Sequence, residues 1–243
     1  RLGVDTYEEL LDALGDDMRP VDPDYCGADL GRLADGSSEY GLWGERYALI
    51  PYSGGAYRES CELPFAGVED VAQLANKRFP SADQYDYGAV AKKCARHPDR
   101  VRTLGDAGDP DFINGIARCR GVEQVLIDIA TEDPVYLELI RRQFEFVYER
   151  NERALRAANG LIDVVCFGED LGDQRSLILR PESYDKLFAP YMERLFAQAH
   201  RHGALTMMHS CGSVRGLIPR LIELGLDILE VVQVDAAGMD IAS

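Results

Sequence analysis

The carboxyl-terminal third of the chain alternates short apolar runs with longer amphipathic segments. The apolar runs cover residues 161–167, 204–209 and 227–232, and the segments between them cover 181–201 and 214–224. Short, nearly continuous apolar runs are typical of strands that are buried on both faces of a sheet. Because helical crossovers between such strands are right-handed and make neighbouring strands parallel, the alternation predicts an α/β fold.

The remaining residues extend this pattern toward the amino terminus. Strands are expected near residues 16–21 and 101–104, and the longest helix over 134–159, with Gly160 as its C-cap. Aromatic and β-branched residues around Ser53-Gly54-Gly55 predict a β-hairpin near 39–63. Further helices are expected over 6–14 (opened by a Thr6–Glu9 capping box), 68–76, 82–96 and 111–118. We interpret residues 1–243 as one domain with a hairpin insertion.

Two of the predicted strands end in polar side chains that suit a metal. His209 and Cys211 are two residues apart at the end of the 204–209 strand, so they lie on the same side of an extended backbone. A thiolate and an imidazole aimed at one point are ligands that zinc prefers. The alternative interpretation is a buried cysteine and a hydrogen-bonded histidine at the rim of the core.

A second polar cluster follows the 161–167 strand. Glu169, Asp170, Gln174 and Arg175 lie where the carboxyl end of a parallel strand would open into a site. Carboxylates at this position could protonate a leaving group or orient a polar substrate. The alternative is a structural turn in which Asp173 acts as a cap and Arg175 pairs with a neighbouring acid.

Composition narrows the class of protein. A net charge of −16 and the absence of clustered Lys and Arg argue against a nucleic-acid partner. Six cysteines without CxxC spacing are typical of reduced thiols in a cytoplasmic protein. No apolar run approaches the roughly 18 residues of a membrane span, and no signal peptide is recognisable. Neither a GxGxxG fingerprint after a strand nor a phosphate-binding P-loop is present.

Taken in order, these motifs resemble the uroporphyrinogen decarboxylase superfamily, and within it the branch of corrinoid-dependent methyltransferases. The resemblance rests on the segments Gly168-Glu169-Asp170-Leu171-Gly172-Asp173-Gln174-Arg175, Pro181-Glu182, His209-Ser210-Cys211-Gly212 and the residues from Leu217 to Asp240. It implies a (β/α)8 TIM barrel with its site at the carboxyl ends of the strands. Only five barrel strands are predicted here, so we expect the central portion of a barrel that is incomplete at both ends. Such an arc exposes edges that the remainder of a longer protein, or a second copy in a homo-oligomer, would cover.

The resemblance also implies a chemistry. His209 and Cys211 match two ligands of a catalytic zinc, and the third ligand of the family is a later cysteine that is missing from this sequence. Glu169, or Asp170, could supply an oxygen ligand in its place. The implied reaction is zinc-assisted transfer of a methyl group between a small methylated compound or a thiol and a cobalamin (corrinoid). The methylcobalamin is carried by a separate corrinoid protein, and no membrane or nucleic acid takes part.

Two rival interpretations remain open. In the first, the chain decarboxylates uroporphyrinogen in porphyrin biosynthesis, which needs no metal but requires arginines for the substrate carboxylates and an Asp that faces the pyrrole nitrogens. Asp17, with Asp16 as its alternative, is the nearest match to that Asp, whereas the arginine-rich motif is absent. In the second, the chain is a non-catalytic barrel fragment or a module that binds a corrinoid protein.

Overall fold

The computed structural model describes residues 3–240 and contains a parallel sheet of five strands. These strands pair in the order β1-β6-β7-β8-β9, which is also their order along the chain. They comprise β1 (Met18–Pro20), β6 (Val101–Leu104), β7 (Val164–Gly168), β8 (Leu205–His209) and β9 (Ile228–Glu230). A doubly wound sheet would reverse its strand order partway. The observed order is instead that of consecutive strands in a barrel.

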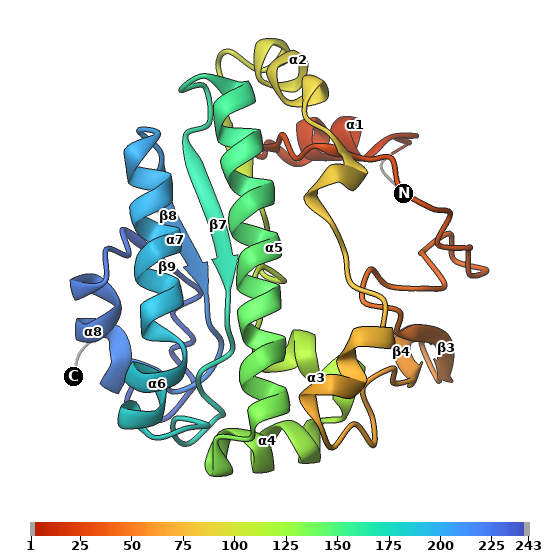
Figure 1. The fold of residues 1–243 in the computed structure, drawn as a ribbon. Helices are drawn as coiled ribbons and strands as arrows, with labels where there is room; N and C mark the ends of the chain where they lie inside the picture. The colour runs from red at the N-terminus through yellow and green to blue at the C-terminus, as the bar shows by residue number, and fades with distance from the viewer. Residues whose placement is uncertain (1–2, 241–243) are drawn as a thin grey trace.

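Helices cover one face of this sheet. The long helix α5 (Pro134–Ala158) and α7 (Ala189–Arg201) run side by side across β7 and β8 (Figure 1). Burial in β8 alternates, so that Thr206 and Met208 are buried while Leu205, Met207 and His209 are more accessible. The buried set packs under the helices. His209 therefore lies on the open face of the sheet.

The open face distinguishes the described chain from a closed barrel. β1 and β9 occupy the two edges, and no pairing joins them within residues 3–240. A hollow of about 780 Å³ lies over this face, and its lining includes apolar side chains of all five strands, among them Val101, Leu205 and Ile228. Five strands span only part of the circumference that eight strands close. The described residues thus form an open parallel sheet of five strands, the number expected from the sequence.

Most predicted elements are present, with local corrections. Helix α1 (Tyr7–Leu14) starts at the predicted capping box, and β3 (Arg46–Tyr52) with β4 (Gly55–Glu62) forms the predicted hairpin. The helix expected over 181–201 is divided into α6 (Pro181–Leu187) and α7, because Pro190 cannot donate the backbone hydrogen bond that a continuous helix needs. The α5 cap is Asn159 in the left-handed region rather than Gly160.

Two predicted helices in the first half of the chain are confirmed only in part. The expected helix at 68–76 is a 3-10 helix at Val71–Asn76. The expected helix at 82–96 is interrupted by β5 (Tyr85–Asp86), which pairs with β2 (Asp24–Tyr25), and only α2 (Gly88–Arg96) is helical beyond it. Tyr85 instead pairs with Tyr25, and the two rings are in edge-to-face contact; tertiary contacts of this kind override local helix propensity.

The remaining helices gather where the parallel strands end. Helices α3 (Asn114–Arg120), α4 (Val122–Thr131) and α6 lie at the end of the molecule toward which β7 points, and the β3–β4 hairpin lies near the same end (Figure 1). The last helix is α8 (Ile218–Glu223). Within residues 3–240, no helix combines the length and the apolar character that crossing a bilayer demands.

A buried ion pair ties α3 and α4 to the loop that follows the hairpin. Arg120 Nε donates to Asp128 Oδ2 at 2.5 Å, and both side chains are almost fully buried. Arg120 Nη1 also donates to the carbonyl oxygens of Val68 and Phe65, at 2.8 and 3.2 Å. The guanidinium therefore satisfies backbone groups that would otherwise be buried without partners.

Replacing this guanidinium tests its structural role. Arg120→Met leaves the Asp128 carboxylate buried without its cation, and we expect the free energy of unfolding to fall by about 3–5 kcal/mol. Urea denaturation at pH 7 measures the change. The control is Arg141→Ala, which breaks exposed ion pairs on α5 and should cost less than about 1 kcal/mol. Equal losses in the two variants would contradict the assignment.

Candidate metal centre

The register between β7 and β8 determines which polar residues meet. Gly168, the last residue of β7, pairs with His209, the last residue of β8, and His209 in turn pairs with Glu230 of β9. Asp170 and Cys211 each follow two residues after these paired ends. Because parallel strands end at the same edge of a sheet, the two loops leave side by side. The adjacent, parallel arrangement expected for these strands is confirmed.

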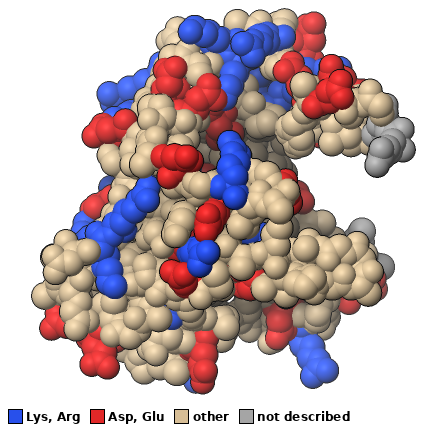
Figure 2. All heavy atoms as spheres, turned by 90° about the vertical axis from the view of Figure 1, so that its right-hand side faces the viewer, with Lys and Arg blue, Asp and Glu red and all other residues tan. Residues whose placement is uncertain are grey.

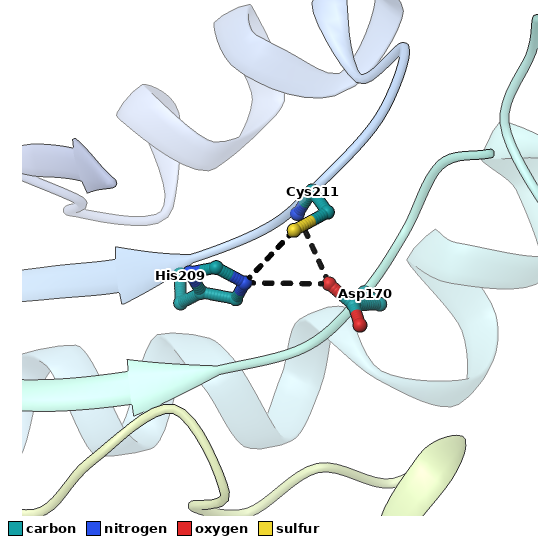
Figure 3. Close-up of side chains that lie close together, drawn as sticks. All are labelled: Asp170, His209 and Cys211. Carbon is teal, nitrogen blue, oxygen red and sulfur yellow. Dashed lines mark hydrogen bonds and ion pairs between the residues drawn. The ribbon is translucent and has the colours of Figure 1, made fainter. Parts of the chain in front are cut away.

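Asp170, His209 and Cys211 form a compact group at this edge (Figure 3). His209 Nε2 lies 3.2 Å from Cys211 Sγ and 3.6 Å from Asp170 Oδ1, and the possible ligand atoms all lie within 4.8 Å of one another. All three side chains are half-buried. One nitrogen, one sulfur and one oxygen thus converge on a single point that solvent can reach. We call these three residues the triad.

Other side chains orient the triad. Glu230 Oε2 lies 2.6 Å from His209 Nδ1, which assigns the imidazole proton to Nδ1 and leaves the Nε2 lone pair facing Cys211. A carboxylate on the remote nitrogen is the usual support of a metal-binding histidine. Asn114 Nδ2 donates to Asp170 Oδ2 at 3.0 Å, and the Cys211 backbone N–H donates to Asp170 Oδ1 at 3.0 Å. Each triad side chain is therefore held before any ligand arrives.

Two glycines allow the loops after β7 and β8 to touch. A Cβ added at Gly212 would lie 2.5 Å from the carbonyl carbon of Gly172, and one added at Gly172 would lie 2.8 Å from the Ser213 nitrogen. Gly212 also has a φ of +83°, in the left-handed region that side chains disfavour. The close contact of these backbones brings Asp170 next to Cys211.

The charge around Cys211 is unfavourable for a free thiolate. Partial burial, followed by the negative charges of Asp170 and Glu230, raises the pKa of the Cys211 thiol above its ordinary value. Without a cation the sulfur therefore holds its proton at neutral pH. A divalent cation would reverse this electrostatic balance, because a coordinating thiol is deprotonated by the charge of the metal.

Glu169, which we expected as a ligand, is not part of the triad. Its carboxylate is almost fully buried and accepts hydrogen bonds from the backbone nitrogens of Phe112 and Ile113, at 2.6 and 3.0 Å. Successive residues of an extended segment point to opposite sides, so Asp170 faces His209 while Glu169 points into the protein. Burial raises the pKa of Glu169 well above its usual range, and nearby Asp111 adds to the effect.

The other predicted site residues lie apart from the triad. Gln174 Oε1 accepts from Gln233 Nε2 at 2.8 Å, and Gln233 Oε1 accepts from the Gly212 N–H at 2.9 Å, so Gln174 supports the glycine contact from outside. The backbone N–H of Arg175 donates to Asp173 Oδ1 at 2.7 Å, which matches the structural alternative of a turn capped by Asp173.

Asp17, expected near the pyrrole-binding position, lies at the wrong end of the sheet. It precedes β1, at the amino ends of the strands, and pairs with Arg100 at 2.5 Å. Asp16 also precedes β1 and accepts from the Met18 N–H. Asp22 is the acid that follows β1 at the carboxyl end, where its Oδ1 accepts from the Gly105 N–H at 2.8 Å. The prediction placed β1 correctly but chose the acids before it.

Three supporting residues escaped the sequence analysis. Glu230 was detectable in principle, since it is an acid within the expected 227–232 strand, and as the last residue of β9 it pairs with His209. Gln233 follows the end of β9 by three residues; it lies in the segment that carries the family resemblance, but no role in the site was predicted for it. Asn114 comes from α3, far from the triad in sequence, and only the folded chain brings it to Asp170.

Comparisons with known proteins add a fold-level likeness. No family model matches the chain, and no curated protein does. Among solved structures, five chains match. One is a methyltransferase from Methanosarcina mazei, with a TM-score of 0.51 and 12% sequence identity over 76% of this chain and 52% of that one. The chain thus spans about half the length of this methyltransferase, and the likeness concerns the α/β fold.

The buried acids beside the triad give a pH prediction. Burial raises the pKa of Asp111 from 3.8 to about 6, although Arg118 opposes the effect. Between these values the unfolded chain releases a proton that the folded chain retains, so stability falls as pH rises. Asp111→Asn removes this contribution. Between pH 4 and 7, we expect the free energy of unfolding of the variant to rise by up to roughly 3 kcal/mol relative to that of the parent.

Urea denaturation at several pH values measures this gain. Asn suits the position because residue 111 has a φ of +49°. The control Asp173→Asn should act in the opposite direction, since backbone N–H groups of Arg175 and Ser176 lower the pKa of Asp173. A parallel pH dependence of Asp111→Asn and the parent chain would contradict the prediction.

The glycine contact gives a metal-binding prediction. Gly212→Ala forces the two loops apart, and we expect zinc affinity to fall by about 10–100-fold, as when other supports of metal ligands are lost. Competition with a chromophoric chelator measures the affinity. Gly216→Ala is the matched control, because a Cβ there meets only Leu177 Cδ1, at an ordinary 3.7 Å. If both variants bind zinc with the affinity of the parent chain, the backbone contact between Gly172 and Gly212 does not determine the geometry of the triad.

Proposed function

We propose that the chain is the zinc-binding part of a corrinoid-dependent methyltransferase with the barrel of the uroporphyrinogen decarboxylase superfamily. The observation that carries the proposal is the convergence of Asp170, His209 and Cys211 at the carboxyl ends of adjacent parallel strands. Enzymes with parallel barrels place their sites at this edge. The His-x-Cys-Gly motif and the methyltransferase among the structural neighbours support the same assignment.

The donor set of the triad fits zinc. Thiolate, imidazole and carboxylate are its usual ligands, and three protein ligands leave the fourth position for a substrate. Asp170 takes the place of the cysteine that the family supplies later in its chain. When bound, zinc would act as a Lewis acid and lower the pKa of a coordinated thiol, or polarise the bond to the departing methyl group.

The chain's own residues prepare this position. Glu230 keeps the His209 proton on Nδ1, so that Nε2 faces the ligand site. Asn114 and the Cys211 backbone N–H hold the Asp170 carboxylate in place. Cys211 gives up its thiol proton when a cation binds, which links metal affinity to pH. A small methylated compound or an acceptor thiol would occupy the open side, and a separate corrinoid protein would deliver or receive the methyl group.

One observation favours the decarboxylase alternative. Three arginines, Arg58, Arg118 and Arg150, line a cavity near the carboxyl ends of β1 and β6. Two of them are engaged by acids, Arg118 by Asp111 and Arg150 by Asp109. A porphyrinogen with eight carboxylates would need free guanidinium groups. Methyl transfer therefore remains the better-supported function.

Zinc content and methyl transfer test the proposal together. The purified chain is loaded with zinc and incubated with methylcobalamin and a small thiol, while loss of the cobalt-bound methyl group is followed by absorbance. We expect one zinc per chain and zinc-dependent demethylation. His209→Ala, Cys211→Ser and Asp170→Asn should each lower zinc affinity and rate by at least about tenfold. Cys61→Ser is the control, since this cysteine is exposed on the hairpin.

Parallel incubation with uroporphyrinogen separates the alternatives. Decarboxylation without any cobalamin demethylation would overturn the methyltransferase assignment in favour of the decarboxylase. A chain that binds no zinc and fails in both assays would favour a non-catalytic module that binds a corrinoid protein.

A further inference from the structure

A pocket of about 710 Å³ lies between α4 and the segment that leads from β7 into α6. Its walls belong to the end of the molecule toward which β7 points, where α3, α4 and α6 gather (Figure 1). A pocket of this size can hold a small ligand. No residue of the triad lines it, so the pocket is a site that the proposed function does not use.

The two long walls of the pocket are apolar. On α4 the lining residues Val122, Leu126 and Ile129 follow the spacing of one helix face, which extends about 10 Å along the helix axis. The opposite wall includes residues 177–179, which are Leu, Ile and Leu. The pocket is therefore elongated, with hydrocarbon side chains on both sides.

Several of these apolar side chains are exposed to water. Val122 is 61% exposed, Leu126 is 43% exposed and Ile178 is 38% exposed. Apolar surface in water is unfavourable, and exposed apolar side chains that line one groove are typical of a binding site. An apolar chain in this pocket would remove all three side chains from water together.

Arg180 adds a positive charge to this apolar lining. Its side chain is exposed and forms no ion pair with any residue in the range 3–240. Ser183 also lines the pocket, and both residues belong to the start of α6, which an ion pair of 2.6 Å between Lys186 and Glu132 ties to the end of α4. A carboxylate is the natural partner of a guanidinium.

The other polar groups of the lining are already engaged within the protein. Asp173 Oδ1 accepts from the backbone N–H groups of Arg175 and Ser176, at 2.7 and 2.8 Å, and these bonds lower the pKa of Asp173. Asn114 Nδ2 donates to the carboxylate of Asp170 at 3.0 Å. The Arg180 guanidinium is therefore the charge that a ligand can complement.

We propose that this pocket binds a fatty acid. Its hydrocarbon chain lies between the α4 face and residues 177–179, and its carboxylate lies at the Arg180 guanidinium. A short acid would leave the apolar walls in water, and an uncharged chain would leave Arg180 without a partner. Both parts of the ligand are therefore needed for full affinity.

Calorimetric titration of the full chain tests binding with three matched probes. Decanoate, used below the concentration at which it forms micelles, carries both the chain and the charge. Decanol lacks the charge, and butyrate lacks most of the chain. We expect decanoate to bind about fivefold more tightly than decanol, and butyrate to show no measurable binding. Absence of decanoate binding, or equal affinity for decanoate and decanol, would overturn the inference.

Variants locate the binding site. Leu126→Glu puts a negative charge into the apolar wall and should weaken decanoate binding by at least about tenfold. Ile127→Glu is the matched control, because this side chain of the same helix is 48% exposed and does not line the pocket. Equal decanoate affinity in the two variants, with each folded by circular dichroism, would exclude this pocket.

A second pair of variants tests the carboxylate position. Arg180→Gln should lower the affinity for decanoate to that for decanol and leave decanol binding unchanged. Arg175→Gln removes an exposed guanidinium that does not line the pocket, and it should bind decanoate as the parent does. A loss of the same size in both variants would show general attraction by surface charge and contradict the assignment.

Other occupants of the apolar walls give different results. A second copy of the chain would appear in sedimentation velocity as a dimer that Leu126→Glu abolishes and decanoate leaves intact. A membrane surface would retain the chain on phosphatidylglycerol vesicles, and Leu126→Glu would release it. Either result without decanoate binding would overturn the inference.

Discussion

The pairing of β7 with β8 is the constraint on which the rest of the site depends. Gly168 lies opposite His209, and this register decides that the next residues of both strands leave the sheet together. A slip of one residue would turn His209 toward the helices and separate it from Asp170. The glycine contact beyond the strands then fixes the distance between the loops. Backbone geometry, more than attraction between the side chains, assembles the triad.

The face of the molecule shown in Figure 2 carries charges of both signs. On the face shown in Figure 2, Asp and Glu lie interspersed with Lys and Arg, and the outline is hollowed along one edge. Mixed charges of this kind keep a protein soluble and give little attraction for a polyanion. The interactions that distinguish this chain are therefore inside its hollows, where charge is partly shielded from water and acts more strongly.

The sequence revealed the strands and the pair His209–Cys211 because both follow from short-range rules. Apolar runs predict strands, and a two-residue spacing predicts a shared side. The third member of the triad was left open between Glu169 and Asp170, since which of two successive acids faces the histidine depends on where β7 ends. Asp17 was chosen because it is close to β1, but proximity in sequence does not say which end of the strand carries the site. Asn114 and the cavity arginines come from segments whose arrangement only tertiary packing decides.

The contact between Glu230 and His209 has a thermodynamic consequence. The imidazole belongs to β8, its carboxylate support belongs to β9, and Asp170 follows β7, so a bound cation would engage three consecutive strands at once. Whatever binds only the folded chain stabilises it in proportion to the logarithm of ligand concentration over the dissociation constant. The cation would therefore stabilise the carboxyl ends of three neighbouring strands in an open sheet. Loss of β9 would weaken metal affinity even though that strand supplies no ligand.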